Sequence, residues 1–181
     1  MDKSTRLTLI EVMAQLSEIF PEMRFGQLVC NLASLVDTSP EAVWTVRDDS
    51  LLVEARAFLD RQVDRLDINV PTTLSRAVTA GPSLDGPRLT AAEDGRRAIL
   101  TTLLNFDSSE PIGKLVANLF ALGKAPTSAT DWSATIWETE DDEFREVLTR
   151  SLDRASSPLL DWSYRFSAHE NPANLSSIHH S

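Results

Sequence analysis

The chain has 181 residues, 42% of them hydrophobic, and a formal net charge of −10 at neutral pH. This composition is sufficient for a hydrophobic core in one domain or two small ones. Because no run of about eighteen apolar residues occurs, a membrane-spanning helix is excluded. The single cysteine, Cys30, excludes an internal disulfide and a cysteine–histidine metal cluster.

The negative charge is spread along the chain and does not form a detachable acidic tail. An acidic surface repels phosphate backbones, so direct nucleic-acid binding is not expected, whereas a basic protein partner is favoured. The alternative is that the charge serves solubility alone. The first residues, Met1 to Arg6, lack the layout of a secretory signal, and we therefore expect a cytoplasmic protein.

Residues 1–65 predict three helices. Apolar side chains between Leu7 and Phe20 recur at helical spacing, and Pro21 suits the first turn of the next helix. That second helix is indicated by a continuous apolar stripe over residues 25–36.

The third helix of this segment follows a short turn. Ser39-Pro40-Glu41 is typical of a helix start and opens a turn that carries Trp44, whose indole is expected to plug the base of the unit. Asp48 or Asp49 is predicted to cap the third helix, because Asp is a preferred N-cap residue.

Residues 66–94 are rich in proline and glycine and are predicted to be a linker, with a short helix over Thr72–Val78. Residues 95–155 predict three further helices, the first preceded by the capping box Thr90-x-x-Glu93. Residues 156–181 are expected to form a short extended aromatic segment followed by a loose polar tail.

The second set of helices repeats the first in sequence. Gly, Leu-Val and Asn-Leu recur at identical spacing in the two central helices, and each copy then has a Trp, an Asp-Asp pair and a Leu-Asp-Arg triplet. We therefore predict an all-α fold built by tandem duplication of a three-helix unit. The matched residues are Gly26 and Gly113, Asn31 and Asn118, Trp44 and Trp137, Asp48-Asp49 and Asp141-Asp142, and Leu59-Asp60-Arg61 and Leu152-Asp153-Arg154. Trp137 is expected to plug the base of its unit as Trp44 does, and Asp141 or Asp142 is expected to cap the last helix. The two glycines are expected to let another helix approach closely, because glycine otherwise costs about 1 kcal/mol in a helix.

No catalytic constellation can be assembled from these residues. The three histidines, His169, His179 and His180, all lie near the C-terminus, and phosphate-loop, dinucleotide, zincin and serine-hydrolase motifs are absent from the sequence. We therefore expect no catalytic residue, no cofactor and no bound metal, and a non-enzymatic function.

The acidic residues allow three interpretations. The carboxylates of residues 138–143 could serve a metal-dependent hydrolase, the Asp and Glu residues of the chain could mimic nucleic-acid charge, or residues 138–143 could bind a basic protein beside exposed aromatic residues. We favour the third; its alternative is that Trp132 covers the seam between the copies and the later aromatic residues complete the core. The candidate partner-binding residues are Trp132, Glu138, Glu140, Asp141, Asp142, Glu143, Trp162 and Tyr164.

The stretch Phe20-Pro21-Glu22-Met23-Arg24-Phe25-Gly26-Gln27-Leu28, followed by Val43-Trp44 and Asp48-Asp49, resembles a family of small uncharacterised bacterial helical domains with the motif aromatic-Pro-x-x-Arg-aromatic-Gly-Gln-Leu. The resemblance covers residues 6–62 and implies a bacterial origin, with no activity attached. The second copy lacks the equivalents of Arg24 and Gln27, so a functional motif would leave at most one site. The combined prediction is an adaptor, an immunity-type inhibitor or a small subunit of a bacterial complex.

Overall fold

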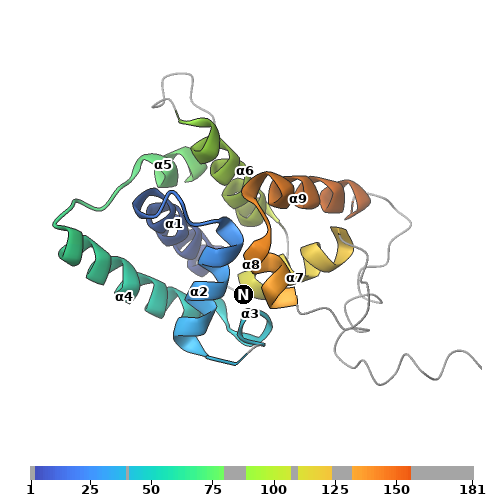
Figure 1. Ribbon diagram of the computed structural model, residues 1–181, viewed down its shortest axis with the longest axis horizontal. Coiled ribbons are helices and arrows are strands. Elements are labelled where there is room, and N and C mark those ends of the chain that lie inside the picture. The colour runs from blue at the N-terminus through green and yellow to red at the C-terminus, as the bar shows by residue number, and fades with distance from the viewer. Residues whose placement is uncertain (1–2, 40, 80–88, 107–109, 124–131, 156–181) are drawn as a thin grey trace, which may run out of the picture.

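The computed structural model describes residues 3–39, 41–79, 89–106, 110–123 and 132–155, and every regular element in these ranges is a helix (Figure 1). The all-α prediction is therefore confirmed. The first five helices are α1 (Lys3–Ile19), α2 (Phe25–Val36), α3 (Ala42–Thr45), α4 (Asp48–Leu66) and α5 (Thr73–Thr79). The remaining ones are α6 (Ala91–Asn105), α7 (Ile112–Gly123), α8 (Trp132–Glu138) and α9 (Asp141–Ala155). Among these helices, none combines the length and the apolar character needed to cross a membrane.

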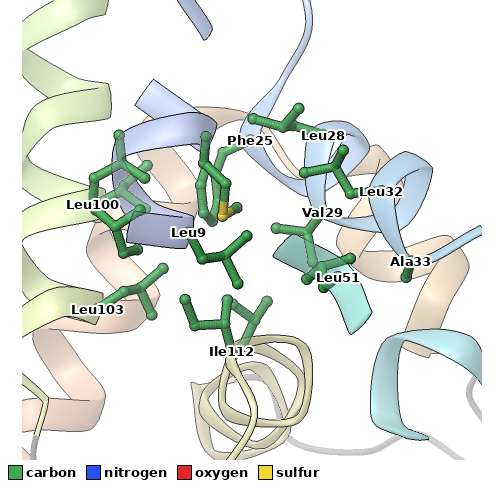
Figure 2. Close-up of a cluster of buried hydrophobic side chains, with 14 of the residues drawn as sticks. Leu9, Phe25, Leu28, Val29, Leu32, Ala33, Leu51, Leu100, Leu103 and Ile112 are labelled. Atoms are coloured by element: carbon green, nitrogen blue, oxygen red, sulfur yellow. The ribbon is translucent and has the colours of Figure 1, made fainter. Parts of the chain in front are cut away.

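One hydrophobic core is shared by helices from both halves of the chain. Helix α1 packs against α4, α5 and α6, while α9 packs against α6 and α7. Figure 2 shows Leu9 of α1 between Leu100 and Leu103 of α6 on one side and Val29 of α2 on the other, with Ile112 of α7 closing the cluster. The apolar stripes predicted from periodicity therefore point into a common interior.

The two halves interlock through their short helices. Helix α3 of the first half packs on α7 of the second, and α8 of the second half packs on α2 of the first. A Cβ atom at Gly26 would lie 1.8 Å from the backbone oxygen of Ile136, and one at Gly113 would lie 2.2 Å from that of Val43. Both glycines are required for close backbone approach, as predicted.

The segment between the halves is packed where the structure describes it. Helix α5 matches the short helix predicted over Thr72–Val78 and lies against α1 and α6, with Leu74 and Val78 buried. The backbone N–H of Leu74 donates to Glu18 Oε1 at 2.7 Å. Helix α6 starts within the predicted linker, and its capping box of Thr90 and Glu93 is confirmed.

Two predictions about helix starts are wrong. Pro21 lies in a turn before α2, whose N-cap is Arg24. The helix starts there because the backbone N–H of Arg24 donates to Gln27 Oε1 at 3.1 Å. The N-cap of α4 is Arg47, without a side-chain cap, and Asp48 is already the first helical residue. The carboxylate of Asp48 is engaged elsewhere, as described below.

Candidate functional site: two junctions and a polar cleft

Each half of the chain caps the central helix of the other half with an aspartate. Asp48 Oδ1 accepts a hydrogen bond from the backbone N–H of Ile112, the first residue of α7, at 2.6 Å. Asp141 Oδ1 accepts one from the N–H of Phe25, the first residue of α2, also at 2.6 Å. A carboxylate at a helix N-terminus satisfies an unpaired amide and interacts favourably with the helix dipole.

A buried arginine accompanies each aspartate. Arg96 donates from Nε to Asp141 Oδ2 at 2.9 Å and from its terminal nitrogens to Asp141 Oδ2, to Ser17 Oγ at 2.9 Å and to the Met23 carbonyl at 2.7 Å. We call this group, with Phe25, the open junction.

The equivalent arginine in the first half is Arg6. It donates to the carbonyl oxygens of Phe106 at 3.1 Å and Glu110 at 2.5 Å. Its Nε lies 3.9 Å from Asp48 Oδ2, beyond hydrogen-bond distance. Neither of these two buried atoms has a hydrogen-bond partner among the residues that the structure describes. Arg6, Asp48 and Ile112 form what we call the sealed junction.

The two junctions differ in their access to water. The Asp48 side chain is 1% exposed, whereas that of Asp141 is 27% exposed. Burial raises the pKa of Asp48 above its ordinary value, and the Ile112 amide and the Arg6 charge only partly oppose this. The neighbouring Asp49 is exposed, and its pKa is lowered by the backbone N–H of Ser50 and by Arg47.

The open junction lines a polar cleft of about 530 Å³. Its walls come from the turn before α2, the first turns of α6 and the start of α9. The lining residues are Pro21, Glu22, Met23, Arg24, Ala91, Ala92, Gly95, Arg96, Glu140, Asp141, Asp142 and Arg145. In this cleft Arg24 pairs with Glu140 at 2.5 Å, and Arg145 pairs with Asp142 at 3.4 Å. The volume lies within the range of small-ligand sites.

The structure separates the acidic candidates into different environments. Glu138, Glu140, Asp142 and Glu143 are exposed, while Asp141 is half-buried at the open junction. The expectation that Asp141 or Asp142 caps its own helix misses this role of Asp141, whose oxygen caps α2. Asp141 therefore joins the two halves of the chain, a structural role that the sequence pattern did not indicate.

The aromatic candidates fall mostly outside the part of the chain that the structure describes. Trp162 and Tyr164 lie in residues 156–181, which the structure does not describe, and Trp132 is the first residue of α8, in a stretch whose side chains are not described. Trp44 is half-buried against the core, but Trp137 is 40% exposed. The prediction that Trp137 plugs the base of its unit is wrong, because α8 presents that indole to solvent beside Glu138.

Sequence reasoning missed both junction arginines. A signal was present, since Arg6 precedes Leu9-Ile10 at the spacing with which Arg96 precedes Ile99-Leu100. An arginine at this position of an apolar helix is buried only when it is paired, so the recurrence points to a paired partner.

The carboxylates near α9 do not form a metal site in the described ranges, where no three side chains of His, Cys, Asp or Glu converge. Their charged neighbours are guanidinium groups, which supply hydrogen bonds at fixed angles. No family model matches the sequence, and no curated protein or solved structure is significantly similar to it.

Proposed function

We propose that the chain is a non-enzymatic interaction module that binds a basic protein partner through its acidic face, defined as Glu138, Glu140, Asp141, Asp142 and Glu143. The observation that carries this proposal is the exposure of Trp137, a residue that is 40% accessible to solvent and directly precedes Glu138. A large aromatic anchor beside charged groups is typical of protein interfaces, and the overall charge of −10 favours a basic partner.

The pairing of the carboxylates favours binding over metal-dependent hydrolysis at residues 138–143. Glu140 is held by Arg24 and Asp141 by Arg96, so guanidinium groups take the positions that a divalent cation would need. The same arginines interrupt a continuous row of negative charge, which argues against mimicry of nucleic acid. An adaptor, an immunity-type inhibitor or a small subunit of a bacterial complex fits this surface.

We also propose that residues 1–65 and 95–155 arose by duplication and that residues 66–94 connect them. The reciprocal caps at Ile112 and Phe25 and the reciprocal close approaches at the two helix-starting glycines support this. We further propose that residues 6–62 are related to small bacterial helical domains. A cytoplasmic location is proposed separately, because the first residues lack the layout of a secretory signal.

The family-like motif has a structural explanation within this proposal. Gln27 Oε1 accepts from the backbone N–H of Arg24 at 3.1 Å, which fixes the start of α2. The Arg24 side chain reaches the carbonyl oxygen of Glu138 at 3.4 Å and the carboxylate of Glu140. Both residues therefore support the acidic face rather than a separate active site.

Affinity capture from the native host tests the proposal. The immobilised full chain is compared with Asp142→Lys and Trp137→Ala, and captured proteins are identified by mass spectrometry. Asp142 is chosen because its side chain is 88% exposed, whereas replacing Asp141 would disturb folding. We expect the wild type to capture a basic protein and each variant to bind that protein more weakly. For Asp142→Lys the loss of binding should be largest at low salt, where charge interactions are least screened.

The matched control is Asp49→Lys, which makes the same charge change at the start of α4. Asp49 follows the sealed junction as Asp142 follows the open one, and its side chain is 59% exposed. Capture should survive this change. If Asp49→Lys and Asp142→Lys lose capture equally, the partner responds to net charge and not to the acidic face, which contradicts the proposal. Undiminished capture by Asp142→Lys and Trp137→Ala would also contradict it.

A further inference from the structure

Gly95 is a helix-interior glycine that the packing does not require. It lies in the second turn of α6 with helical backbone angles, and a Cβ atom built on it would meet no atom of the described residues within 4 Å. This separates it from Gly26 and Gly113, where a backbone oxygen occupies the space. A glycine that weakens a helix without a steric reason indicates that the open space itself is used.

That open space is the floor of the polar cleft. Ala91, Ala92 and Gly95 present little side-chain volume along one face of α6, and the floor continues to the buried Arg96. In the first half, Thr5 precedes Arg6 as Gly95 precedes Arg96. There a side chain stands at the corresponding position, and the adjacent aspartate is sealed from water.

The cleft walls favour a cation over an anion. The Arg96 guanidinium already donates hydrogen bonds to Asp141, Ser17 and Met23, so few of its N–H groups remain to bind an anion. The exposed Glu22, Glu140 and Asp142 also line the cleft, and a carboxylate that makes one ion pair keeps acceptor capacity for further donors. The lining residues comprise three arginines and four carboxylates. Glu140, Asp141 and Asp142 each pair with one of the arginines, so the excess of negative charge comes from Glu22.

We propose that this cleft receives a single arginine or lysine side chain of the protein partner. The aliphatic stem would lie on Ala91, Ala92 and Gly95, and the charged end would donate to the carboxylates at the rim. The inference rests on the proposed function in one respect, the basic protein partner. It adds the place where one cationic side chain enters and the residue whose small size admits it.

A titration of the isotope-labelled full chain, followed by NMR, tests the cleft directly. The probes are N-acetyl-arginine amide, the citrulline analogue of the same shape without charge, and N-acetyl-glutamate amide. We expect the arginine probe to shift backbone amides of residues 22–24, 91–96 and 140–145, and the citrulline probe to bind at least about tenfold more weakly. Equal binding of arginine and citrulline probes, or shifts spread over the whole surface, would overturn the proposal.

Two variants of one residue make the test specific. Gly95→Leu fills the floor of the cleft. The affinity for the arginine probe should fall by about tenfold or more, because the aliphatic part of the probe can no longer enter. Gly95→Ala removes the glycine while adding only a methyl group, and should bind within about threefold of the wild type. Gly95→Ala should melt at or above the wild-type temperature, because an added Cβ meets no described atom within 4 Å. The melting temperature of Gly95→Leu is measured beside it, so that a loss of binding is separated from unfolding. Unchanged binding by Gly95→Leu would contradict the inference.

Partner capture separates failure of this inference from failure of the proposed function. If Asp142→Lys loses the partner while Gly95→Leu retains it, the acidic face is used but the cleft is not, and the inference is wrong. If the arginine probe binds the cleft but Asp142→Lys captures the partner normally, the cleft is selective for a cation and the proposed role of the acidic face is wrong.

Discussion

The sealed and open junctions perform the same task with different electrostatics. In each, an aspartate from one half caps the central helix of the other at 2.6 Å, and a buried arginine stands beside it. At the sealed junction Arg6 Nε and Asp48 Oδ2 lie 3.9 Å apart, whereas at the open junction Arg96 makes a two-point contact with Asp141. The more buried pair, at the sealed junction, therefore has the poorer contact. Burial removes both charges from water, and this cost is offset only where the hydrogen-bond geometry is good, as at the open junction.

The largest expected effect comes from the glycines that allow the halves to interlock. Gly26→Ala would place Cβ 1.8 Å from the Ile136 oxygen, and Gly113→Ala would place it 2.2 Å from the Val43 oxygen. Because both obstacles are backbone atoms, each change should lower the free energy of unfolding by more than about 4 kcal/mol, with Gly26→Ala the worse. Urea denaturation measures this. A loss below about 1 kcal/mol would show that the halves can move apart freely.

Removing the open-junction carboxylate should have the next largest effect. Asp141→Ala leaves the Arg96 guanidinium, whose side chain is 6% exposed, without its counter-ion and leaves the Phe25 amide uncapped. We expect a loss of about 3 kcal/mol in the free energy of unfolding. Denaturation monitored by circular dichroism tests this, with Asp142→Ala as the exposed neighbour that should change little. Equal small losses for the two variants would remove the distinction between junction and surface.

The all-helical class and most of the helices could be predicted from the sequence because their signals are local. Periodic apolar stripes predicted the long helices, and neighbouring residues predicted the Thr90–Glu93 capping box and the helix over Thr72–Val78. The need for Gly26 and Gly113 was also predictable, because a glycine early in a helix is most often retained for close packing. Each of these inferences depended on residues within about one helical turn of each other.

The candidate site was not predictable in the same way because its bonds are non-local. Asp48 binds an amide 64 positions away and Asp141 one 116 positions away, so both looked like ordinary N-caps of the helices they begin. Trp137 matched Trp44 in sequence but not in exposure, because burial depends on which elements cover each indole. A single glycine such as Gly95 carries no sequence signal that distinguishes open space from close packing.

A smaller effect is expected on the pH dependence of the free energy of unfolding, through the buried Asp48 of the sealed junction. The folded-state pKa of Asp48 is raised above 3.8, so the stability linked to its protonation is present below pH 3.8 and is lost as pH rises through the raised pKa. Asp48→Asn removes this loss, so the stability of the variant should improve relative to wild type between about pH 4 and neutrality. Urea denaturation at a series of pH values measures the difference.

The exposed neighbour provides a control of opposite sign. The pKa of Asp49 is lowered below 3.8, so its stabilising contribution is present above pH 3.8 and is lost as pH falls through the lowered value. Asp49→Asn should therefore lose stability relative to wild type as pH rises through the lowered pKa to about 4, and the difference should stay constant from there to neutrality. If Asp48→Asn follows the same trend as Asp49→Asn, burial does not control the sealed junction.

The smallest expected effect has the opposite direction and connects stability with the cleft. Gly95→Ala adds a methyl group where no atom of the described part of the chain lies within 4 Å, in a helix where alanine is the better former. The free energy of unfolding should therefore rise by about 0.5–1 kcal/mol. Thermal denaturation beside Gly26→Ala measures the contrast between a glycine that packing needs and one that it does not. A destabilised Gly95→Ala would mean that the floor of the cleft is closed in solution. A stabilised one, combined with lost binding in Gly95→Leu, would show that helix stability is given up at the open junction to keep the cleft accessible.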